Sequence, residues 1–583
     1  MPEKKEYRNR IKFVAALFLF GSLAIIFRIN YLQFNKEAQT LRKLSDQNAW
    51  KDVVYNPERG KIFDRNGYML AGNKTVYEIG VTIKNVKDPN TVALSLASEL
   101  GRDYEEIYGM ITNPNTDIVY LTIDQHVPAE NAERLKKLQA DLENKPDSSG
   151  SLAGVDFTER IMRSYPDNFL ASNVIGFVNL NNVGNYGIEQ RYDTILAGIP
   201  VKKRVPLDPN NVAEIPDIPS GVDLILTIDR DIQTMVEEEL KKAMDDTEAE
   251  SGTIVVMNPR NGEILAMAST PEMDLNNFTE AANLYKTSSD YNRAVSAQYE
   301  PGSVFKILTM AAAIDSGLVS PETTYLDTGF YEIGGAYVFN WDQGAWGVQN
   351  MVGCFEHSLN VCMAHLADLM GENTFYTYMR RFGIGHPTGI DLASEAKGRL
   401  KNPEDKDWYK VDLGTNSFGQ GVAVSPIQMM TAASAIANDG KMVFPHVVYA
   451  MVSNNIQSNT PQQTLGTPIS AQTAHTVNEM LAEALVGNQS GANIDGYRIA
   501  GKTGTASIPG PDGRYLQNKT NASFVGWGPA DDPKFMIYVW MEKPKNSDWA
   551  SYVAAPIFHN VAEKLVVLMN IPPDHIRQQL AGQ

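Results

Sequence analysis

The sequence has few of the residues that commonly bind metals or carry redox chemistry, since its 583 residues include two cysteines and eight histidines. His357 and His365 lie eight positions apart, which is not the spacing of a metal-binding pair. Basic residues are also in deficit, because 51 lysines and arginines stand against 69 acids and give a net charge of −18. Phosphate binding needs a basic face. We therefore expect no nucleic-acid partner, and no metal site at these histidines.

The two cysteines, Cys354 and Cys362, are expected to be small buried side chains. If both lie on one helix, their separation of eight positions corresponds to a rise of about 12 Å. Disulfide-bonded cysteines have Cα atoms within about 7 Å of each other. The spacing therefore argues against a disulfide, and the cysteines alone do not indicate a cellular compartment.

Long uncharged apolar runs are scarce, and the clearest one covers residues 13–27. Extended to Leu32, with Arg28 at the interface, a helix over residues 13–32 spans the hydrocarbon core of a bilayer, which is about 30 Å thick. No small-x-small cleavage site follows, so we expect an uncleaved anchor and not a removed signal peptide; a buried core helix is the alternative. The basic tail, residues 1–12, predicts a cytoplasmic N-terminus and an extracytoplasmic remainder.

Residues 33–220 are expected to form a mixed region without catalytic groups. Strand-like pieces alternate with turn signals, and Asn66-Gly67 between two apolar pieces predicts a β-hairpin. The region offers neither a metal-binding spacing nor a nucleophile with a nearby base. Its last part, residues 201–220, contains four prolines and is typical of a linker.

The catalytic region is expected over residues 221–572. Its first elements are predicted to be a strand at 223–228, an amphipathic helix at 229–246 and a hairpin at 253–267. Its central feature is a Ser-x-x-Lys motif, Ser303 to Lys306, which follows a Pro-Gly turn and opens an apolar run that predicts a buried helix ending at Ser316-Gly317. Residues three apart share a helix face, so the amine is placed to take the proton of the hydroxyl. The motif alone occurs by chance about once or a few times in such a chain.

Two further clusters of hydroxyl and polar groups follow in the sequence. Ser358-x-Asn360 heads an apolar segment, and Lys502-Thr503-Gly504 lies on a strand-like segment that continues to Thr505. Glycines on such a segment let a ligand approach the backbone closely. Each cluster is a weak signal alone, whereas the order Ser-x-x-Lys, Ser-x-Asn, Lys-Thr-Gly is specific.

This trio resembles the fingerprint of the penicillin-binding protein and serine β-lactamase superfamily. Other segments, over nearly the whole chain, resemble class B penicillin-binding proteins. These segments are residues 28–33, 59–67, 186–189, 226–233, 419–421, 437–438 and 523–526.

The resemblance implies an α+β multidomain protein with a single N-terminal transmembrane helix. A mixed α/β pedestal, or dimerisation, domain with a linker would occupy residues 33–220. A transpeptidase domain of the penicillin-binding and β-lactamase type, with an antiparallel sheet flanked by helices and an all-helical part, would occupy residues 221–572. Residues 573–583 would form a C-terminal tail.

The resemblance also implies a role for each motif residue. Ser303 would be the acyl-accepting nucleophile and Lys306 its base, with a pKa lowered from about 10.4 by burial and by Lys502. Ser358 would relay protons to the leaving amine, and Asn360 would hold the amide of the substrate.

The third motif would bind the end of the substrate. Lys502, Thr503 and Gly504 would meet the terminal carboxylate of a D-Ala-D-Ala stem peptide, helped by the Thr505 hydroxyl. The backbone N–H groups of Ser303 and Thr505 would form the oxyanion hole, in which one donor is typically worth about 3–4 kcal/mol. This chemistry requires neither a metal nor an organic cofactor.

The implied function is peptidoglycan D,D-transpeptidation, with peptidoglycan stem peptides as substrates and β-lactams as covalent inhibitors. The sequence contains no second region that resembles a glycosyltransferase. A polytopic membrane glycosyltransferase and other cell-wall proteins are therefore expected as partners. A monomer and a dimer are both compatible with the sequence. Septal and elongation roles are both compatible with the sequence.

Three alternatives compete with this interpretation. Residues 496–503 match the P-loop pattern, but a P-loop must open a helix and the sequence that follows contains prolines. Residues 272–276 match the Glu-x-x-Leu-Asn element of class A β-lactamases, but they precede the nucleophile, so a D,D-carboxypeptidase or β-lactamase-type hydrolase is the weaker hypothesis. A non-catalytic β-lactam sensor or scaffold on the same fold is the third, although all motif side chains are present.

Overall fold

The computed structural model describes residues 3–36, 39–40, 50–114, 118–144, 150–206, 218–487, 491–510 and 512–581. It divides into two compact units. One consists of Met1–Glu58 with Gly198–Ser220, and the other of Arg59–Ala197 with Gly221–Gln583.

The first unit contains the predicted anchor and a two-stranded sheet. Helix α1, Glu3–Phe34, is longer than the expected segment, and its Tyr7–Phe34 part is long and apolar enough to cross a membrane. Strand β1, Trp50–Tyr55, pairs antiparallel with β8, Val201–Pro206. The start of the predicted linker is therefore a strand, while residues 207–217 lie outside the described residues.

A long strand, β3, organises the first half of the second unit. The sheet runs in the order β20-β19-β9-β2-β3-β4, with β5 also paired to β3. Its strands are β2 Ile62–Phe63, β3 Met69–Thr82, β4 Tyr120–Pro128, β5 Val155–Ser164, β9 Asp223–Leu226, β19 Val448–Ser453 and β20 Ile456–Asn459. The β2–β3 pairing confirms the hairpin predicted at Asn66-Gly67. The strand predicted at 223–228 is also confirmed, and it pairs in parallel with β2.

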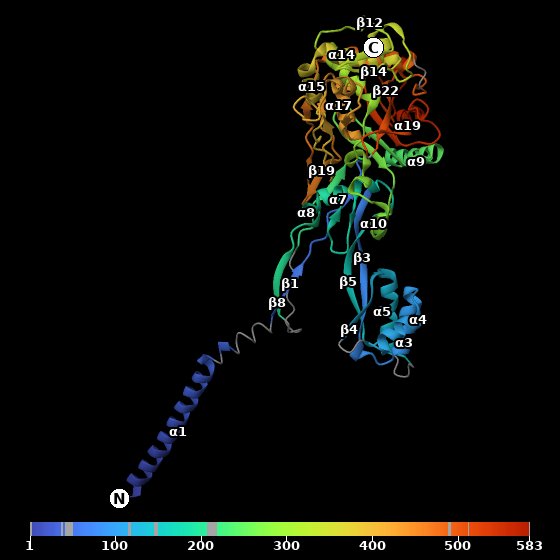
Figure 1. The fold of residues 1–583 in the computed structure, drawn as a ribbon. Coiled ribbons are helices and arrows are strands. Elements are labelled where there is room, and N and C mark those ends of the chain that lie inside the picture. Colours follow the sequence, from blue (N-terminus) through green and yellow to red (C-terminus); the bar gives the residue numbers. More distant parts are fainter. Residues whose placement is uncertain are drawn as a thin grey trace. The chain divides into compact units, whose positions relative to one another are not determined.

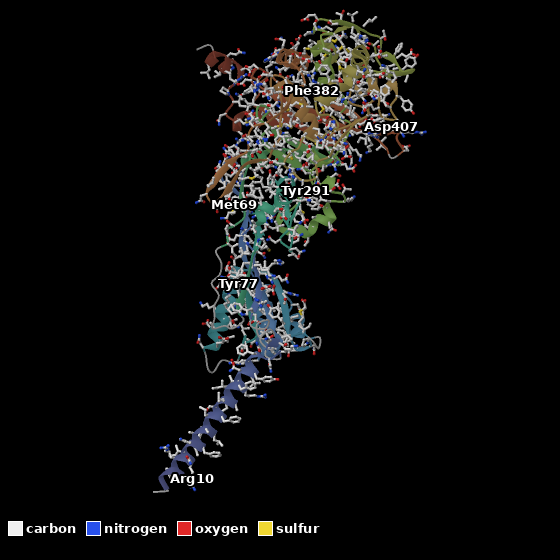
Figure 2. All side chains as sticks on the ribbon, turned by 90° about the vertical axis from the view of Figure 1, so that its left-hand side faces the viewer. Arg10, Met69, Tyr77, Tyr291, Phe382 and Asp407 are labelled. Carbon is white, nitrogen blue, oxygen red and sulfur yellow. A yellow bond between two sulfur atoms is a disulfide. The ribbon has the colours of Figure 1, made fainter. Side chains whose placement is uncertain are left out.

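Three helices cover the part of this sheet formed by β3 and β4. They are α3 Pro89–Leu100, α4 Tyr104–Thr112 and α5 Ala129–Glu143. The side chains of Asp88 and Asp103 accept hydrogen bonds from backbone N–H groups at the starts of α3 and α4 and so cap them. Figure 2 shows Met69 and Tyr77 at different heights along β3, with Tyr77 nearer these helices.

A buried ion network joins two segments that the sequence analysis related to class B penicillin-binding proteins. Glu189, on α7 Gly187–Arg191, accepts from Arg59 Nε at 2.7 Å and from Arg163 Nε at 2.7 Å. All three side chains are buried. Because an unpaired buried charge is costly, the network fixes the ends of β5 and α7 relative to Arg59.

The part of the second unit formed by residues 221–572 is built on a five-stranded antiparallel sheet in the order β11-β10-β24-β23-β22. Its strands are β10 Ser251–Met257, β11 Ile264–Ser269, β22 Ala500–Pro509, β23 Tyr515–Gly528 and β24 Phe535–Glu542. The β10–β11 pair confirms the predicted hairpin, and α9 Arg230–Thr247, capped by Asp229, confirms the predicted amphipathic helix.

Helices cover both faces of this sheet, as expected for its fold class. On β24, Ile537 and Val539 pack in the core with α9 and α19 Ala554–Leu568, whereas Tyr538 and Trp540 belong to the core of the opposite face. That face is covered by α12 Lys306–Asp315, α14 Asn360–Met370, α17 Pro426–Ala437 and α18 Ala471–Gly487. Figure 1 shows α14, α15 and α17 on one side of β22 and α9 and α19 on the other.

Shorter elements connect these layers. They are η1 Ile83–Asn85, α6 Ser172–Ile175, β6 Phe177–Val178, β7 Gly184–Asn185, α8 Asp193–Ala197, η2 Leu275–Glu280, α10 Ala281–Leu284, η3 Ser288–Asp290, α11 Arg293–Ser296, β12 Thr324–Asp327, β13 Phe330–Ile333, β14 Ala336–Phe339, β15 Gly347–Asn350, α15 Glu372–Arg381, β16 Arg399–Leu400, α16 Lys410–Asn416, β17 Val422–Ala423, β18 Met442–Val443, β21 Thr464–Gly466 and α20 Asp574–Ala581.

The prediction that the cysteines are unpaired is wrong. Cys354 lies on α13 Met351–Glu356 and Cys362 on α14, and the two form a disulfide with Cα atoms 6.2 Å apart. The prediction assumed one continuous helix. The chain instead turns between the helices at Ser358, which has a φ of +52°, and this reversal brings the cysteines together.

Candidate active site

Ser303 lies in a 3₁₀ turn directly before the buried helix. The turn is η4 Gly302–Phe305, and α12 begins at Lys306, so the predicted helix is present but its first turn is tighter than α-helical. Gly302 has a φ of +57°, and its N–H donates to Gly419 O at 3.1 Å. A Cβ on Gly302 would lie 2.8 Å from Thr505 O. The turn that carries Ser303 is therefore packed against β22, and glycine is required for that approach.

Lys306 brings the first two motifs together. Its side chain is fully buried at 0% exposure, although it opens the apolar helix. Its Nζ donates to Ser358 O at 2.6 Å, to Ser358 Oγ at 3.2 Å and to Asn360 Oδ1 at 2.8 Å. The amine is thus placed at the predicted relay hydroxyl, one turn from Ser303.

Burial lowers the pKa of Lys306 well below the usual lysine range, and the nearby Lys502 ammonium lowers it further. The three hydrogen-bond partners of Nζ are all uncharged, so they do not offset the cost of burying a charge. The expected direction and its two causes are confirmed. A larger share of the amine is therefore neutral near neutral pH, which a general base requires.

Ser358 and Asn360 lie at the reversal between α13 and α14. Asn360 is the first residue of α14, and its Nδ2 donates to Phe339 O at 3.1 Å while its Oδ1 accepts from Lys306. The Cys354–Cys362 disulfide closes the loop that contains both motif residues. The position of the Ser-x-Asn motif is consequently fixed by α13 and α14 on either side and by its hydrogen bonds with the Lys306 amine.

Lys502 lies on β22 and is buried. Its Nζ donates to Thr503 O at 3.2 Å and to Thr503 Oγ1 at 3.3 Å. Burial lowers its pKa to about 7. The third motif therefore supplies a cation whose charge is sensitive to pH close to neutrality.

Gly504 and Thr505 follow on the same strand, beside the turn that carries Ser303. A Cβ on Gly504 would lie 2.6 Å from Ser523 Oγ and 2.9 Å from Pro301 O, so a larger side chain has no space. Thr505 is half-buried, and its Oγ1 accepts from Ala550 N at 3.0 Å. The strand thus presents polar groups next to η4 without a side chain at Gly504.

Two features of this site have no motif that would have predicted them from the sequence. Glu300, three residues before Ser303, accepts from Gly421 N at 3.0 Å and from Tyr515 OH at 3.0 Å. Trp341 and Trp549 contact each other with ring centroids 5.0 Å apart. The sequence signal for a role of Glu300 in the site was its position directly before the Pro-Gly turn.

The structure also decides between motifs that matched by coincidence. Residues 500–509 form strand β22, so the P-loop match is not followed by a helix and cannot be a nucleotide site. Asn276 exchanges hydrogen bonds with the backbone of Tyr165, in the pedestal part, and its Nδ2 also donates to Asn168 Oδ1. The Glu-x-x-Leu-Asn match therefore has a structural role there.

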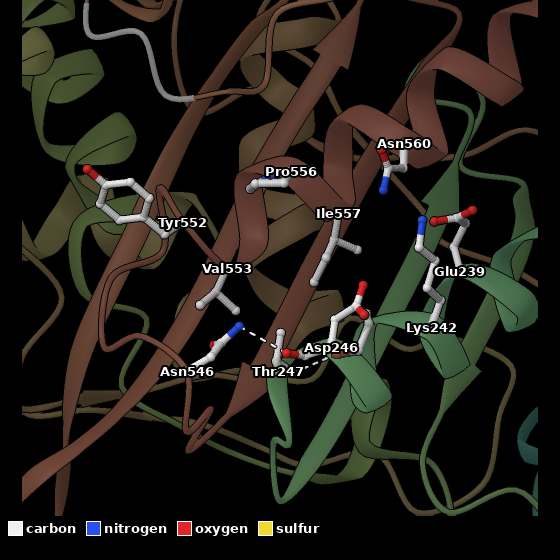
Figure 3. A pocket seen from close by; sticks show the side chains of 11 residues that line it. Glu239, Lys242, Asp246, Thr247, Asn546, Tyr552, Val553, Pro556, Ile557 and Asn560 are labelled. Atoms are coloured by element: carbon white, nitrogen blue, oxygen red, sulfur yellow. Dashed lines mark hydrogen bonds between the residues drawn. The ribbon is translucent and has the colours of Figure 1, made fainter.

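One small pocket, of about 110 Å³, contains none of the motif residues. Figure 3 shows Glu239 and Asp246 of α9 facing Pro556 and Ile557 of α19, with Asn546 at one edge. Asn546 Nδ2 donates to Asp246 O at 3.1 Å.

The assembled groups can perform acyl transfer. Ser303 lies one turn before Lys306, the buried Lys306 amine contacts the Ser358 hydroxyl, and Lys502 lies on β22, against which the Ser303 turn packs. Nucleophile, base and oriented polar partners are the components of serine acyl-transfer sites.

Comparison with known proteins agrees with this geometry. The family model described as penicillin-binding protein transpeptidase domain matches residues 252–563, and the one described as penicillin-binding protein dimerisation domain matches residues 54–217. The chain is 32% identical to stage V sporulation protein D of Bacillus subtilis, over 97% of this chain and 86% of that protein. It is 29% identical to the peptidoglycan D,D-transpeptidase FtsI of Escherichia coli K12, over 98% of this chain and 94% of that protein.

A solved structure has the same fold. The crystal structure of penicillin-binding protein 3 from Mycobacterium tuberculosis, complexed with aztreonam, superposes with a TM-score of 0.68 at 26% identity. The match covers 89% of this chain and 98% of that one. Since the family models, the relatives over nearly the full length and the fold all agree, the chain belongs to the class B penicillin-binding proteins, in the penicillin-binding protein transpeptidase family.

Proposed function

We propose that the chain is a peptidoglycan D,D-transpeptidase that cross-links stem peptides through an acyl-enzyme on Ser303. The observation that carries this proposal is the position of Lys306. Its amine is fully buried, has a lowered pKa and contacts both Ser358 and Asn360. A buried lysine with these partners suits proton transfer better than a structural role.

In the first half-reaction, Ser303 Oγ attacks the carbonyl carbon between the two D-alanines of a stem peptide. Neutral Lys306 takes the hydroxyl proton, and the backbone N–H groups of Ser303 and Thr505 stabilise the oxyanion. The C–N bond then breaks, and the nitrogen of the leaving D-alanine receives a proton through Ser358. An ester of Ser303 remains.

In the second half-reaction, an amine from a neighbouring stem peptide attacks this ester. The amine loses a proton to the Ser358–Lys306 pair, a new amide bond forms, and Ser303 recovers its proton. Water in place of the amine would give a D,D-carboxypeptidase. The sequence match to the element that activates the deacylating water in class A β-lactamases offers no support for this reaction, because its Asn276 is bonded to the backbone of Tyr165.

The third motif is proposed to bind the substrate's terminal carboxylate. Lys502 supplies the charge, the hydroxyls of Thr503 and Thr505 supply donors, and Gly504 leaves space for the peptide. Asn360 holds the substrate amide. A β-lactam would use the same contacts, with Ser303 opening the lactam ring in place of the peptide bond.

We also propose a cellular arrangement. Helix α1 anchors the chain with residues 1–12 in the cytoplasm, and the pedestal over residues 33–220 and the catalytic region over 221–572 are extracytoplasmic. The basic residues of the tail and the uncharged length of α1 support this orientation. A polytopic membrane glycosyltransferase that contacts the anchor and pedestal would supply the glycan.

A labelling experiment tests the proposed nucleophile. The full chain in detergent is treated with a β-lactam and analysed by intact mass and peptide mapping. We expect one adduct, on Ser303, which is absent in Ser303→Ala and forms much more slowly in Lys306→Ala. Ser316→Ala, at the other end of α12, should label like the wild type. Labelling that persists in Ser303→Ala would refute the assignment.

A further inference from the structure

Two exposed tryptophans meet between segments that contact the Ser-x-Asn and Lys-Thr-Gly motifs, and the mechanism described above does not use them. Trp341 follows β14, and Trp549 lies in the segment between β24 and α19. Their exposures are 49% and 42%, so neither fills the protein core. Their ring centroids are 5.0 Å apart with an interplanar angle of 69°, the edge-to-face geometry that aromatic pairs favour.

Trp341 is connected to the Ser-x-Asn motif. Its Nε1 donates to His357 O at 3.0 Å, and His357 immediately precedes Ser358. Two residues before Trp341, the carbonyl of Phe339 accepts from Asn360 Nδ2 at 3.1 Å. The short segment 339–341 therefore contacts the turn before Ser358 and the side chain of Asn360.

Trp549 is connected, through its neighbours in the chain, to the strand that carries the Lys-Thr-Gly motif. The N–H of its neighbour, Ala550, donates to Thr505 Oγ1 at 3.0 Å. On its other side, Asp548 O accepts from Thr520 Oγ1 at 3.0 Å. The segment 548–550 thus contacts β22, which carries the Lys-Thr-Gly motif, and its neighbour β23.

Behind this segment the packing is incomplete. Asn546, Tyr552 and Val553 line the small pocket against α9 (Figure 3). Within the segment, Ala550 is fully buried and fixes the backbone, while the Trp549 ring lies largely outside the core. The contact with Trp341 restrains the Trp549 ring from the side of the Ser-x-Asn motif.

We propose that Trp341 and Trp549 are positioning residues that set the separation between the Ser358–Asn360 segment and Thr505 on β22. This inference rests on the proposed acyl transfer, because it concerns the alignment of those groups. Without the ring contact, segments 339–341 and 548–550 move independently. The proton relay and the carboxylate-binding hydroxyl then lose their mutual alignment.

A double-mutant cycle on acylation tests this pair. The second-order rate constant for acylation by a chromogenic β-lactam is measured for full-length wild type, Trp341→Ala, Trp549→Ala and the double variant. We expect each single variant to lose about 2- to 10-fold, the range that one aromatic contact supports. The double variant should lose about as much as one single variant, because both substitutions remove the same contact.

Conservative and control variants separate positioning from general destabilisation. Trp549→Phe keeps a ring opposite Trp341 and should recover most of the lost rate, whereas Trp549→Leu should behave like Trp549→Ala. Trp50→Ala removes a tryptophan of similar exposure, 43%, from the other unit and should acylate like the wild type. The temperature of thermal unfolding should change by no more than about 2 °C in any of these variants.

The inference is overturned if the single variants acylate at the wild-type rate, if their losses multiply in the double variant, or if Trp549→Phe is as slow as Trp549→Leu. A wild-type enzyme that is not acylated on Ser303 would overturn the proposed function instead. The two failures are distinguishable because the adduct on Ser303 is mapped in the same samples.

Discussion

Lys306 and Lys502 differ from the surface lysines of this chain in their surroundings and not in their chemistry. Both are buried, and burial lowers the pKa of each. The lower pKa makes Lys306 available as a neutral base, while Lys502 must stay protonated to attract a carboxylate. The two residues therefore impose opposite requirements on pH.

A pH profile of acylation tests these requirements. As pH rises, Lys306 loses its proton and the rate should increase; above about 7, the pKa of Lys502, that lysine loses its charge and the rate should fall. Lys502→Arg keeps a charge at all accessible pH values. The variant should therefore lose the fall at high pH even if its maximal rate is lower. An unchanged alkaline limb in Lys502→Arg would show that another group causes it.

Gly504 is a residue whose absent side chain matters. A Cβ there would lie 2.6 Å from Ser523 Oγ and 2.9 Å from Val304 Cγ1. Gly504→Ala should force β22 away from the Ser303 turn, slowing acylation by an order of magnitude or more and destabilising the fold by about 1–3 kcal/mol. The β-lactam acylation rate and chemical denaturation measure these effects.

Gly466→Ala is the matched control for this substitution. Gly466 lies on strand β21, and its Cβ would meet only Met442 Cε, at an ordinary 3.6 Å. Stability and acylation should both stay near the wild-type values. Acylation of Gly504→Ala at the wild-type rate would contradict the close packing of η4 against β22.

At the scale of elements, the site depends on where helices and strands begin and end. Ser303 lies in η4, Lys306 begins α12, and Asn360 begins α14. Reading the apolar run after Ser303 as a helix predicted α12, because the run is buried on all sides, whereas the segment after Asn360 was described only as apolar. The reversal at Ser358 was not predicted, since nothing in the local sequence marks the positive φ there. That missed turn is the reason the disulfide was missed.

The buried ion network in the pedestal part should contribute strongly to the free energy of unfolding. Glu189 holds Arg59 and Arg163, and all three are buried. Glu189→Gln leaves the buried Arg163 guanidinium without its carboxylate and Arg59 with Asp193 alone, 2.8 Å away, and should cost about 3–5 kcal/mol in the free energy of unfolding. Urea denaturation of the full chain measures this change.

The control for this substitution is an exposed pair of the same chemistry. Glu106→Gln removes the partner of Arg102, 2.6 Å away on α4, and should cost no more than about 1 kcal/mol. Equal costs for the two variants would show that burial does not set the strength of the Glu189 network.

At the scale of the whole molecule, several segments distant in sequence complete each other's structure. Strands β19 and β20, from residues 448–459, extend the sheet that begins with β2 and β3. Tyr192 OH donates to Asp391 Oδ2 at 3.2 Å, which connects the pedestal part to the transpeptidase part. The packing of the second unit therefore continues across the boundary predicted at residue 220.

The sequence by itself determined the local elements and the chemistry of the site. Periodicity and turn residues predicted the 62–71 hairpin, the α9 helix and the apolar helix after Ser303, because these depend on contacts between near neighbours. The order of three motifs predicted which side chains carry reactivity. The lowered pKa of Lys306 followed from the requirement for a neutral base, whereas that of Lys502 was not predicted.

Only the tertiary structure decided how distant segments meet. The Cys354–Cys362 disulfide, the completion of the pedestal sheet by residues 448–459 and the contact between Trp341 and Trp549 all join positions whose local sequence carries no signal for the partner. The physical reason is that such contacts depend on the direction of the chain after each turn. One dihedral angle, as at Ser358, changes which side chains come together.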